Sequence, residues 1–362
     1  MGNSPASPWL GFSLGTWARI LRANGFKVSP GNLHRTLGIT AASGIHSLLA
    51  LVEKAIFSRR IARLDVSPAP VFIIGHWRCG TTYLHELLAQ DPNHTFPNTY
   101  ECFDPTHFVL TEGSTDKLLR SFLPDNRPMD NMTVGFERPQ EDEFALCGMG
   151  LPSPYRMLAF PNNPGQFEQF LELDDLPENE LQRWKAGLYR LFQRVQYKRP
   201  GRMIVKSPSH TFRIPHLLSL FPDARFIHIV RNPYRVAPST IHLWQSLCTN
   251  WALQRPDFSG LEEMVLRVYT RLHDRLDSTR SLIPAENLYE LTFEQLTDHP
   301  LAHMEKIYDY LRLGDFSQAA PHIQSFLDSI TDYKTNVYEP DQRLNDLVAH
   351  HWGHVAKRYG YS

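Results

Sequence analysis

The chain has 362 residues, which is long enough for one large α/β domain with insertions. Apolar residues make up 42% and charged residues 21% of it, the proportions of a globular protein. Lys and Arg total 37 against 38 Asp and Glu, and the net charge of −1 excludes the basic excess of a nucleic-acid-binding protein. None of the four cysteines has a C-x-x-C or zinc-site spacing, so we expect free thiols in a reducing, cytoplasmic compartment.

Residues 1–66 predict a helical N-terminal extension. The N-terminus lacks the pattern of a signal peptide. The stretch 37–57 is apolar, but Ser, His, Glu and Lys side chains interrupt it, which makes it a poor transmembrane span. It can pack on the domain, which we favour, or lie on a membrane surface. The helical segments expected are Leu14–Asn24, Pro30–Leu37 and Ala41–Arg60.

A strand, a loop and a helix follow one another in residues 71–88, which read VFIIGHWRCGTTYLHELL. Val71–Ile74 has the β-branched and aromatic composition of a buried strand. Leucines then recur at helical spacing after Gly80. Such a loop directs backbone N–H groups and a helix N-terminus at one point, which suits a phosphate.

The residues of this loop indicate which kind of phosphate. Gly75 and Gly80 have the glycine spacing of the nucleoside-triphosphatase motif G-x-x-x-x-G-K-[ST]. Thr81 occupies the position of its lysine, and the cation is Arg78 inside the loop. The sequence therefore predicts an anion cradle without the γ-phosphate lysine, although an ordinary strand–helix turn has the same spacing.

Residues 93–165 are rich in Pro, Asn, Asp and aromatic residues and predict long loops with short helices near Asp116–Phe122 and Asp142–Cys147. Long irregular segments in a compact domain are usually lids or substrate walls. We expect this region and residues 332–338 to close over the substrates. Residues 166–200 are expected to be helical.

Three more strands are expected, each followed by a helical pattern: Arg202–Lys206, Ala224–Val230 and Leu288–Leu291. Thr292 is the expected N-cap of the helix after the last strand. Strands that alternate with helices predict a parallel sheet with right-handed crossovers. We therefore expect one α/β domain over 67–362, a three-layer fold around a parallel sheet, with helical additions at both ends.

Polar residues follow three of these strands: Arg78 to Thr82, Lys206 to His210 and Arg231 to Ser239. A single basic residue after a strand is often only a surface charge. Ligands of an open parallel sheet bind beyond the carboxyl ends of its strands, where all three clusters are expected. Together they predict one anion-binding site.

The segments HWRCGTTYLHELL, IVKSPSH and FIHIVRNPYRVAPST, within residues 70–300, resemble the sulfotransferases that use 3′-phosphoadenosine 5′-phosphosulfate. The similarity is closest to the bacterial-type branch of that superfamily. It implies transfer of a sulfuryl group to a hydroxyl or amine of a small or lipid-like acceptor. A P-loop kinase-like phosphotransferase and an inactive nucleotide-binding protein are the alternatives.

The resemblance also implies the roles of particular residues. The first motif would hold the 5′-phosphosulfate, the third the 3′-phosphate, and Lys206 matches the basic residue that this branch places after its middle strand. Cys79 stands where the family commonly has Ser, which leaves a backbone donor unchanged. The implied donor-binding residues are Arg78, Cys79, Gly80, Thr81, Thr82, Arg231 and Ser239.

Sulfuryl transfer should be an in-line displacement that depends on positioning and charge, with Arg78 neutralising the leaving oxygens and no metal required. The acceptor needs a general base, and Glu101 is the first candidate because it follows the first helix. The rivals are the acidic cluster with Glu141 and Glu143, and the histidines His210 and His76. The sequence leaves the acceptor and the oligomeric state open.

Overall fold

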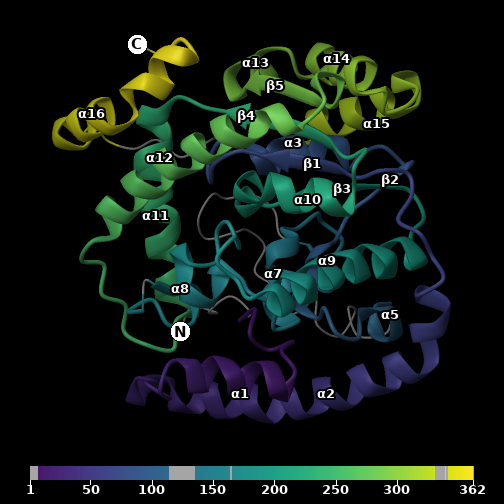
Figure 1. The fold of residues 1–362 in the computed structure, drawn as a ribbon, viewed down its shortest axis with the longest axis vertical. Coiled ribbons are helices and arrows are strands. Elements are labelled where there is room, and N and C mark those ends of the chain that lie inside the picture. The colour runs from purple at the N-terminus through teal and green to yellow at the C-terminus, as the bar shows by residue number, and fades with distance from the viewer. Residues whose placement is uncertain (1–6, 114–134, 164, 331–338, 340, 362) are drawn as a thin grey trace. The chain divides into compact units, whose positions relative to one another are not determined.

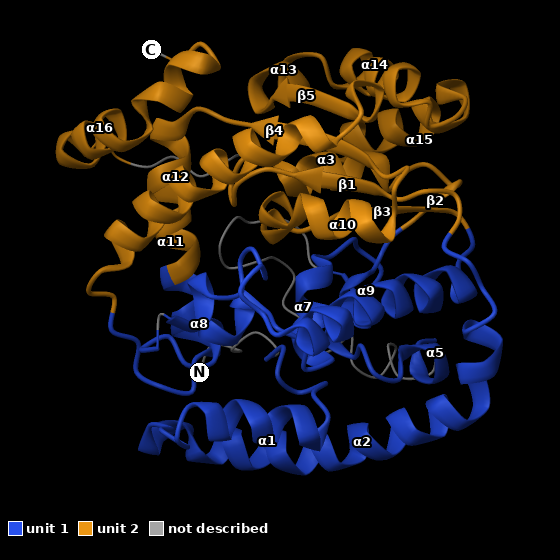
Figure 2. Cartoon of the chain, viewed as in Figure 1, with its two compact units in different colours: residues 1–66, 96–200, 245–257 blue, residues 67–95, 201–244, 258–362 orange. Residues whose placement is uncertain are grey.

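The computed structural model describes residues 7–113, 135–163, 165–330, 339 and 341–361 (Figure 1). The chain forms two compact units (Figure 2). Unit 1 comprises Met1–Val66, Phe96–Pro200 and Gln245–Asp257, and unit 2 comprises Ser67–Thr95, Gly201–Trp244 and Phe258–Ser362. One junction between the units coincides with the boundary expected at residues 66 and 67. The single domain expected over 67–362 stays a prediction.

Unit 2 contains a parallel sheet of five strands in the order β2-β3-β1-β4-β5. The central strand pairs Ile73 with Lys206 on one side and Ile74 with His228 on the other. The sequence predicted four of these strands and missed β2, which has only two residues. The strands are β1 Val71–Ile74, β2 His94–Thr95, β3 Arg202–Lys206, β4 Arg225–Val230 and β5 Leu288–Thr292.

Helices cover both faces of this sheet, which confirms the three-layer α/β fold (Figure 1). Val71 and Ile73 point into a cluster with leucines of α3 (Thr81–Leu88) and residues of α14 (Pro300–Leu311) and α15 (Phe316–Ser329). Phe72 points to the other face, where its ring contacts Phe221 and Phe226. The other helices of unit 2 are α10 Ile214–Leu220, α12 Leu261–Thr279, α13 Phe293–Asp298 and α16 Gln342–Arg358.

The helix α13 begins as the sequence predicted. Thr292 is its N-cap, and the Thr292 side chain accepts a hydrogen bond from the backbone N–H of Gln295 at 3.2 Å. The Gln295 side chain returns a bond to the Thr292 N–H at 2.9 Å, which completes a capping box. This cap fixes the chain direction directly after the last strand of the sheet.

Unit 1 is helical in its described residues. The long helix α2 runs without a break where the sequence predicted two helices, and α11 (Pro233–Trp251) begins in unit 2 and ends in unit 1. The expected helix at Asp116–Phe122 and the expected closing segment 332–338 lie outside the described residues. The helices of unit 1 are α1 Leu14–Ala23, α2 Leu33–Ile61, α4 Thr99–Phe103, α5 Phe108–Thr111, α7 Asp142–Gly148, α8 Gly165–Glu168 and α9 Glu178–Lys198.

The core of unit 1 is organised around α9, which contacts α2, α5 and α7. Its apolar residues recur three and four positions apart, so one face of the helix is buried. Trp184 at the start of this face and Val195 near its end have no exposed surface. The same core includes Trp9, whose indole N–H donates to the carbonyl of Trp251 at 2.8 Å.

Candidate donor site and general base

The loop after β1 needs glycine at both ends. Gly75 has a φ of +144°, and a Cβ there would lie 2.4 Å from the backbone oxygen of Ile229 on β4. Gly80 has a φ of +95°, and a Cβ there would lie 2.2 Å from the ring of Phe293. Any other residue would force the loop away from β4 or from α13. The glycine spacing seen in the sequence thus has a steric cause in the fold.

The loop ends at the N-terminus of α3, where Gly80 is the N-cap and Thr81 and Thr82 are the first helical residues. The first N–H groups of a helix have no intrahelical acceptor, and the helix dipole adds positive potential there. Thr211 fixes the other end of the loop, since its hydroxyl accepts from the Gly75 N–H at 2.9 Å and donates to the Gly75 carbonyl at 3.3 Å. The sequence analysis did not single out Thr211.

Arg78 lies at the centre of the site. Its φ of +69° is in the left-handed region, which is unusual for a residue other than glycine. Its side-chain Nε–H donates to the Ser239 hydroxyl at 2.9 Å, and Arg231 donates to the Arg78 carbonyl at 3.4 Å. The structure therefore brings together three of the residues that the two expected phosphate motifs supply.

The ring of Phe293 contacts Arg231. The guanidinium carbon of Arg231 lies 4.3 Å from the centre of the Phe293 ring, a cation–π contact. Phe293 also packs against Gly80, so one aromatic ring supports both the loop and the second cation. The sequence predicted only the cap at Thr292, one residue earlier, and missed this ring.

Cys79 is buried within the loop. Burial raises the pKa of its thiol to about 12, although nearby Arg231 acts in the opposite direction. The thiol is therefore protonated at neutral pH and too shielded to act as a nucleophile. The backbone N–H of Cys79 donates to the His76 carbonyl at 3.3 Å, and its role toward an anion stays a prediction. All four cysteines are free, which agrees with the sequence analysis.

Lys206 is the last residue of β3 and is 2% exposed. Its register partner is Ile73, so it lies beside the central strand near the point where the loop begins. Its role in the reaction stays a prediction.

The two histidine alternatives are both buried in unit 2. His76 packs against Tyr269 at 4.9 Å between ring centres, and burial lowers its pKa to about 4, so it is neutral at pH 7. His210 is fully buried, and its ring lies edge-on to Phe72 at 5.4 Å. Both rings pack against aromatic side chains, and whether either histidine is the base stays a prediction.

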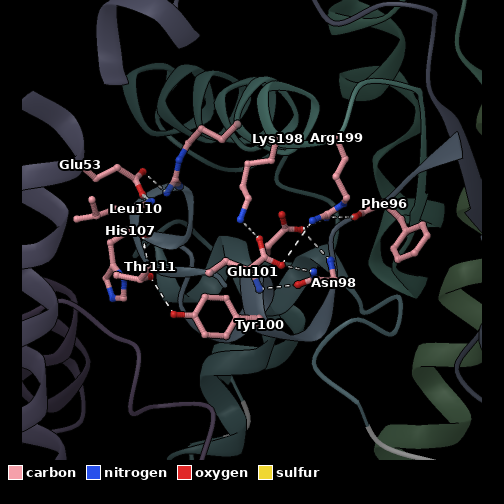
Figure 3. A network of polar contacts seen from close by, with 12 residues as sticks. Glu53, Phe96, Asn98, Tyr100, Glu101, His107, Leu110, Thr111, Lys198 and Arg199 are labelled. Carbon is pink, nitrogen blue, oxygen red and sulfur yellow. Dashed lines mark hydrogen bonds and ion pairs between the residues drawn. The ribbon is translucent and has the colours of Figure 1, made fainter. Parts of the chain in front are cut away.

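Glu101 is in unit 1 and belongs to a polar network (Figure 3). It is the third residue of α4, where it forms a capping box with Asn98, with both bonds at 2.9 Å. The same carboxylate oxygen, Oε2, accepts from Arg199 at 2.7 Å. The other oxygen, Oε1, is buried and has no hydrogen-bond partner among the described residues. Glu101 thus stabilises its helix through Oε2, while Oε1 remains able to accept a proton.

Burial raises the pKa of Glu101 to about 6, although the neighbouring Arg199 opposes the shift. Glu101 is then mostly ionised at pH 7 and is a stronger base than an exposed carboxylate. The acidic rivals are also in unit 1, at the start of α7. Glu141 accepts a hydrogen bond from the Tyr155 hydroxyl, and Glu143 is fully buried. The identity of the base stays a prediction.

The described residues bring together one set of possible metal ligands, His46, Asp104 and His107 of unit 1. His46 Nδ1 and His107 Nε2 are 2.6 Å apart, and the ring planes differ by 18°. Ligand atoms around a tetrahedral zinc ion lie roughly 3.3 Å apart, so this geometry is that of an N–H···N hydrogen bond. We assign the pair a structural role in tying α2 to the segment before α5.

Comparison with known proteins places this site in a family. The model of the sulfotransferase family matches residues 70–317. The omega-hydroxy-beta-dihydromenaquinone-9 sulfotransferases Stf3 of Mycobacterium bovis and Mycobacterium tuberculosis are each 43% identical over 353 residues, which cover 98% of this chain and 91% of the relative.

Solved structures agree on the fold. The sulfotransferase STF9 of Mycobacterium avium superposes with a TM-score of 0.74 at 19% identity, covering 92% of this chain and 87% of that one. The sulfotransferase STF1 of Mycobacterium tuberculosis H37Rv gives 0.61 at 17% identity, covering 93% and 91%. With the glycine-bounded loop and the paired arginines of unit 2, these matches establish that the chain belongs to the sulfotransferase family and is an enzyme of that class.

Proposed function

We propose that this sulfotransferase takes its sulfuryl group from 3′-phosphoadenosine 5′-phosphosulfate and transfers it to the terminal hydroxyl of a long-chain isoprenoid quinone. The convergence of Arg78, Ser239 and Arg231 beyond the central strand supports the donor. The acceptor class rests on the relative at 43% identity, whose name gives a hydroxylated menaquinone as its substrate.

The chain offers separate groups for the two anionic ends of such a donor. The loop N–H groups and the N-terminus of α3 would hold the 5′-phosphosulfate. Arg231, held over Phe293, and Ser239 would hold the 3′-phosphate. Arg78 donates to Ser239 at 2.9 Å, so a hydrogen bond joins the two anion sites. Binding of an anion at one site would therefore change the environment of the other.

In the transfer, the acceptor oxygen bonds to sulfur as the bond from sulfur to the bridging phosphate oxygen breaks. That oxygen keeps the electron pair and leaves as part of the 5′-phosphate, and Arg78 and Lys206 would stabilise its charge. The acceptor proton passes to the general base, for which we propose Glu101 through its unpartnered Oε1. Every charge that develops then has a side-chain or backbone partner of the protein, and we propose that no metal takes part.

A long-chain quinone resides in a membrane, so the enzyme must meet its acceptor there. We propose that residues 37–57, which lie within α2, provide this contact. The sequence alone favoured packing on the domain. In unit 1 one face of the helix packs and the other is exposed, which leaves the exposed face available for this contact.

The function is tested with purified protein, sulfur-35-labelled donor and an ω-hydroxylated menaquinone in detergent micelles. We expect a labelled sulfate ester of the quinone, identified by mass spectrometry, and none from the same quinone without its hydroxyl group. Arg78→Ala should slow the transfer roughly 10²–10³-fold, the usual effect of removing one stabiliser of the developing charge. Transfer of the γ-phosphate of ATP would contradict the proposal and support the kinase alternative.

A further inference from the structure

The helix α2 exposes an apolar face. Nine exposed apolar residues between positions 37 and 56 recur three or four apart along one side, as on a single helix face, and Gly38 and Lys54 in this range are exposed as well. Leu37, Leu48 and Leu51 are 71%, 62% and 65% exposed. We call this set the outer face, and it consists of Leu37, Ala41, Gly44, Ile45, Leu48, Leu51, Val52, Ala55 and Ile56.

The opposite side of α2 carries the polar residues and packs within unit 1. Thr40 accepts from the Trp17 indole at 2.9 Å, and Ser47 accepts from the Leu14 backbone at 2.8 Å. Glu53 is 4% exposed and pairs with Arg194 at 2.5 Å. Surface helices of globular proteins bury their apolar side and expose their polar side. α2 buries Ser43 and Glu53 as well as Ile39 and Ile61, while most of its apolar side chains between positions 44 and 56 are exposed, which suits a helix whose outer surroundings are apolar.

The packing of α2 indicates whether this helix crosses a bilayer or lies on its surface. Among the described residues one helix, Pro30–Ile61, is long and apolar enough to cross a membrane. A spanning α2 would have to withdraw Glu53 from Arg194 and from the Leu110 N–H, which it accepts at 3.0 Å. A buried charge that loses its partners costs several kcal/mol. The interactions within unit 1 therefore favour a helix that lies in the surface plane.

The charge of this region fits an anionic surface. The first 63 residues contain eight Lys and Arg residues and one acidic residue, the buried and paired Glu53. Over the whole chain acidic residues outnumber basic ones by 38 to 37, so this excess is local. His34 and Arg59 are exposed at the two ends of the outer face, about one helical turn beyond it.

Other exposed apolar side chains occur near α2 in the sequence. Leu10 and Leu14 are 41% and 45% exposed, and Phe26 is 64% exposed in the turn between α1 and α2. Phe26 also has a φ of +56°, a strained conformation for an aromatic residue. Such strain persists where function requires a side chain in an unusual position.

We propose that the outer face of α2 docks unit 1 on the surface of a bilayer that contains anionic lipid. The apolar side chains enter the boundary between headgroups and acyl chains, and the cationic residues contact the phosphates. The docking proposal does not depend on the proposed function. Its purpose, access to a lipid acceptor, rests on the proposed function.

The experiment is flotation of the full chain with phosphatidylcholine vesicles, with and without phosphatidylglycerol. We expect binding that is stronger with the anionic lipid and weaker at high salt. The double variant Leu48→Glu and Leu51→Glu should lower the partition coefficient about 100-fold. Arg59→Gln and Arg60→Gln should lower it about fivefold each on anionic vesicles.

The matched control is Leu282→Glu, which places the same charge at a leucine of unit 2 that is 54% exposed. It should float like the unaltered protein. Thermal unfolding should be the same in all these variants, because every altered side chain is exposed. Sedimentation without vesicles tests the alternative that a second copy of the chain, rather than a membrane, covers the outer face. A dimer that Leu48→Glu converts to monomer, or flotation unchanged by the double variant, would overturn the proposal.

The two proposals can fail separately. If docking is wrong and the function is right, the double variant will sulfate the quinone in vesicles as fast as the unaltered enzyme. If the function is wrong and docking is right, flotation will follow the predictions while no quinone is sulfated. Activity on quinone in detergent micelles should be the same in the double variant and the unaltered enzyme.

Discussion

Arg78 contributes to the donor loop through both its backbone and its side chain. A left-handed φ at a residue other than glycine costs on the order of 1 kcal/mol, and the Ser239 hydrogen bond helps to offset this cost. The motif predicted that Arg78 faces an anion. Its contact with a serine 161 residues later could not be predicted from the loop, because it depends on how α11 leaves β4.

Arg231 provides the first test of the donor site. Arg231→Ala removes the cation expected at the 3′-phosphate, so binding of adenosine 3′,5′-bisphosphate should weaken by about 1.5–3 kcal/mol. Calorimetry measures this directly. The control is Arg235→Ala, an exposed residue in the first turn of α11, which should bind normally. Equal affinity in the two variants would remove Arg231 from the site.

Glu101 can be tested without disturbing its helix cap. In Glu101→Gln the amide oxygen can accept the bonds that Oε2 now accepts from Asn98 and Arg199, and the NH₂ group takes the place of Oε1. If Glu101 is the base, kcat should fall roughly 10²–10⁴-fold while donor binding survives. The unaltered enzyme should also lose activity below about pH 6, where the carboxylate gains a proton, because burial raises its pKa to about 6.

The control for Glu101 is Asn98→Ala, which breaks the cap and keeps the carboxylate. It should lower the free energy of unfolding by about 1 kcal/mol and leave most of the activity. An active Glu101→Gln beside an inactive Glu141→Gln or Glu143→Gln would move the base to the acidic cluster. His210→Ala examines the histidine alternative in the same assay.

At the scale of elements, the donor loop depends on the close approach of two strands. Gly75→Ala would place a methyl group 2.4 Å from the Ile229 carbonyl oxygen at a φ of +144°. We expect a loss of about 2–4 kcal/mol in the free energy of unfolding, together with weaker donor binding. Chemical denaturation and calorimetry measure the two effects.

The control for this substitution lies in α2. Gly38 has no atom within 4 Å of an added Cβ, and it lies inside a long helix. Gly38→Ala should therefore stabilise the protein by about 0.5–1 kcal/mol. If both substitutions have the same effect on stability, the steric explanation of the motif is wrong.

The helix α2 shows where sequence patterns stop being informative. The sequence analysis predicted separate helices Pro30–Leu37 and Ala41–Arg60, but α2 is one continuous helix, and Thr40 at the expected break accepts a hydrogen bond from Trp17. The pattern of polar and apolar residues along 37–57 was visible in the sequence. The side that packs was not, because the partners of the polar residues, such as Arg194, are far away in the chain.

At the scale of the whole molecule, the sulfotransferase reaction needs no metal in our proposal. Activity should therefore be the same in the presence of a strong chelator. The rate of sulfuryl transfer after dialysis against the chelator measures this, with and without added magnesium. A loss that magnesium restores would show that a cation, rather than Arg78 and Lys206, neutralises the leaving group.

The fold class and four of the five strands could be predicted because alternating strand and helix patterns are local. The division of the chain into units was less accessible, since unit 1 is assembled from three separate segments. The balanced net charge also concealed a local excess of cations near the N-terminus. A net charge computed over the whole chain does not show an excess of one sign on a single surface.

The order of the strands has a consequence for how the enzyme is made. β1 is central and pairs with β3 and β4, both of which the ribosome synthesises more than a hundred residues after it. Loop closure over such separations is slow, and a nascent chain cannot complete both pairs until β4 has emerged. The donor loop, whose glycine rests on Ile229, is therefore among the last features to form. Nucleotide binding therefore requires that β4 has paired with β1, so a chain that stops short of β4 should not bind the donor.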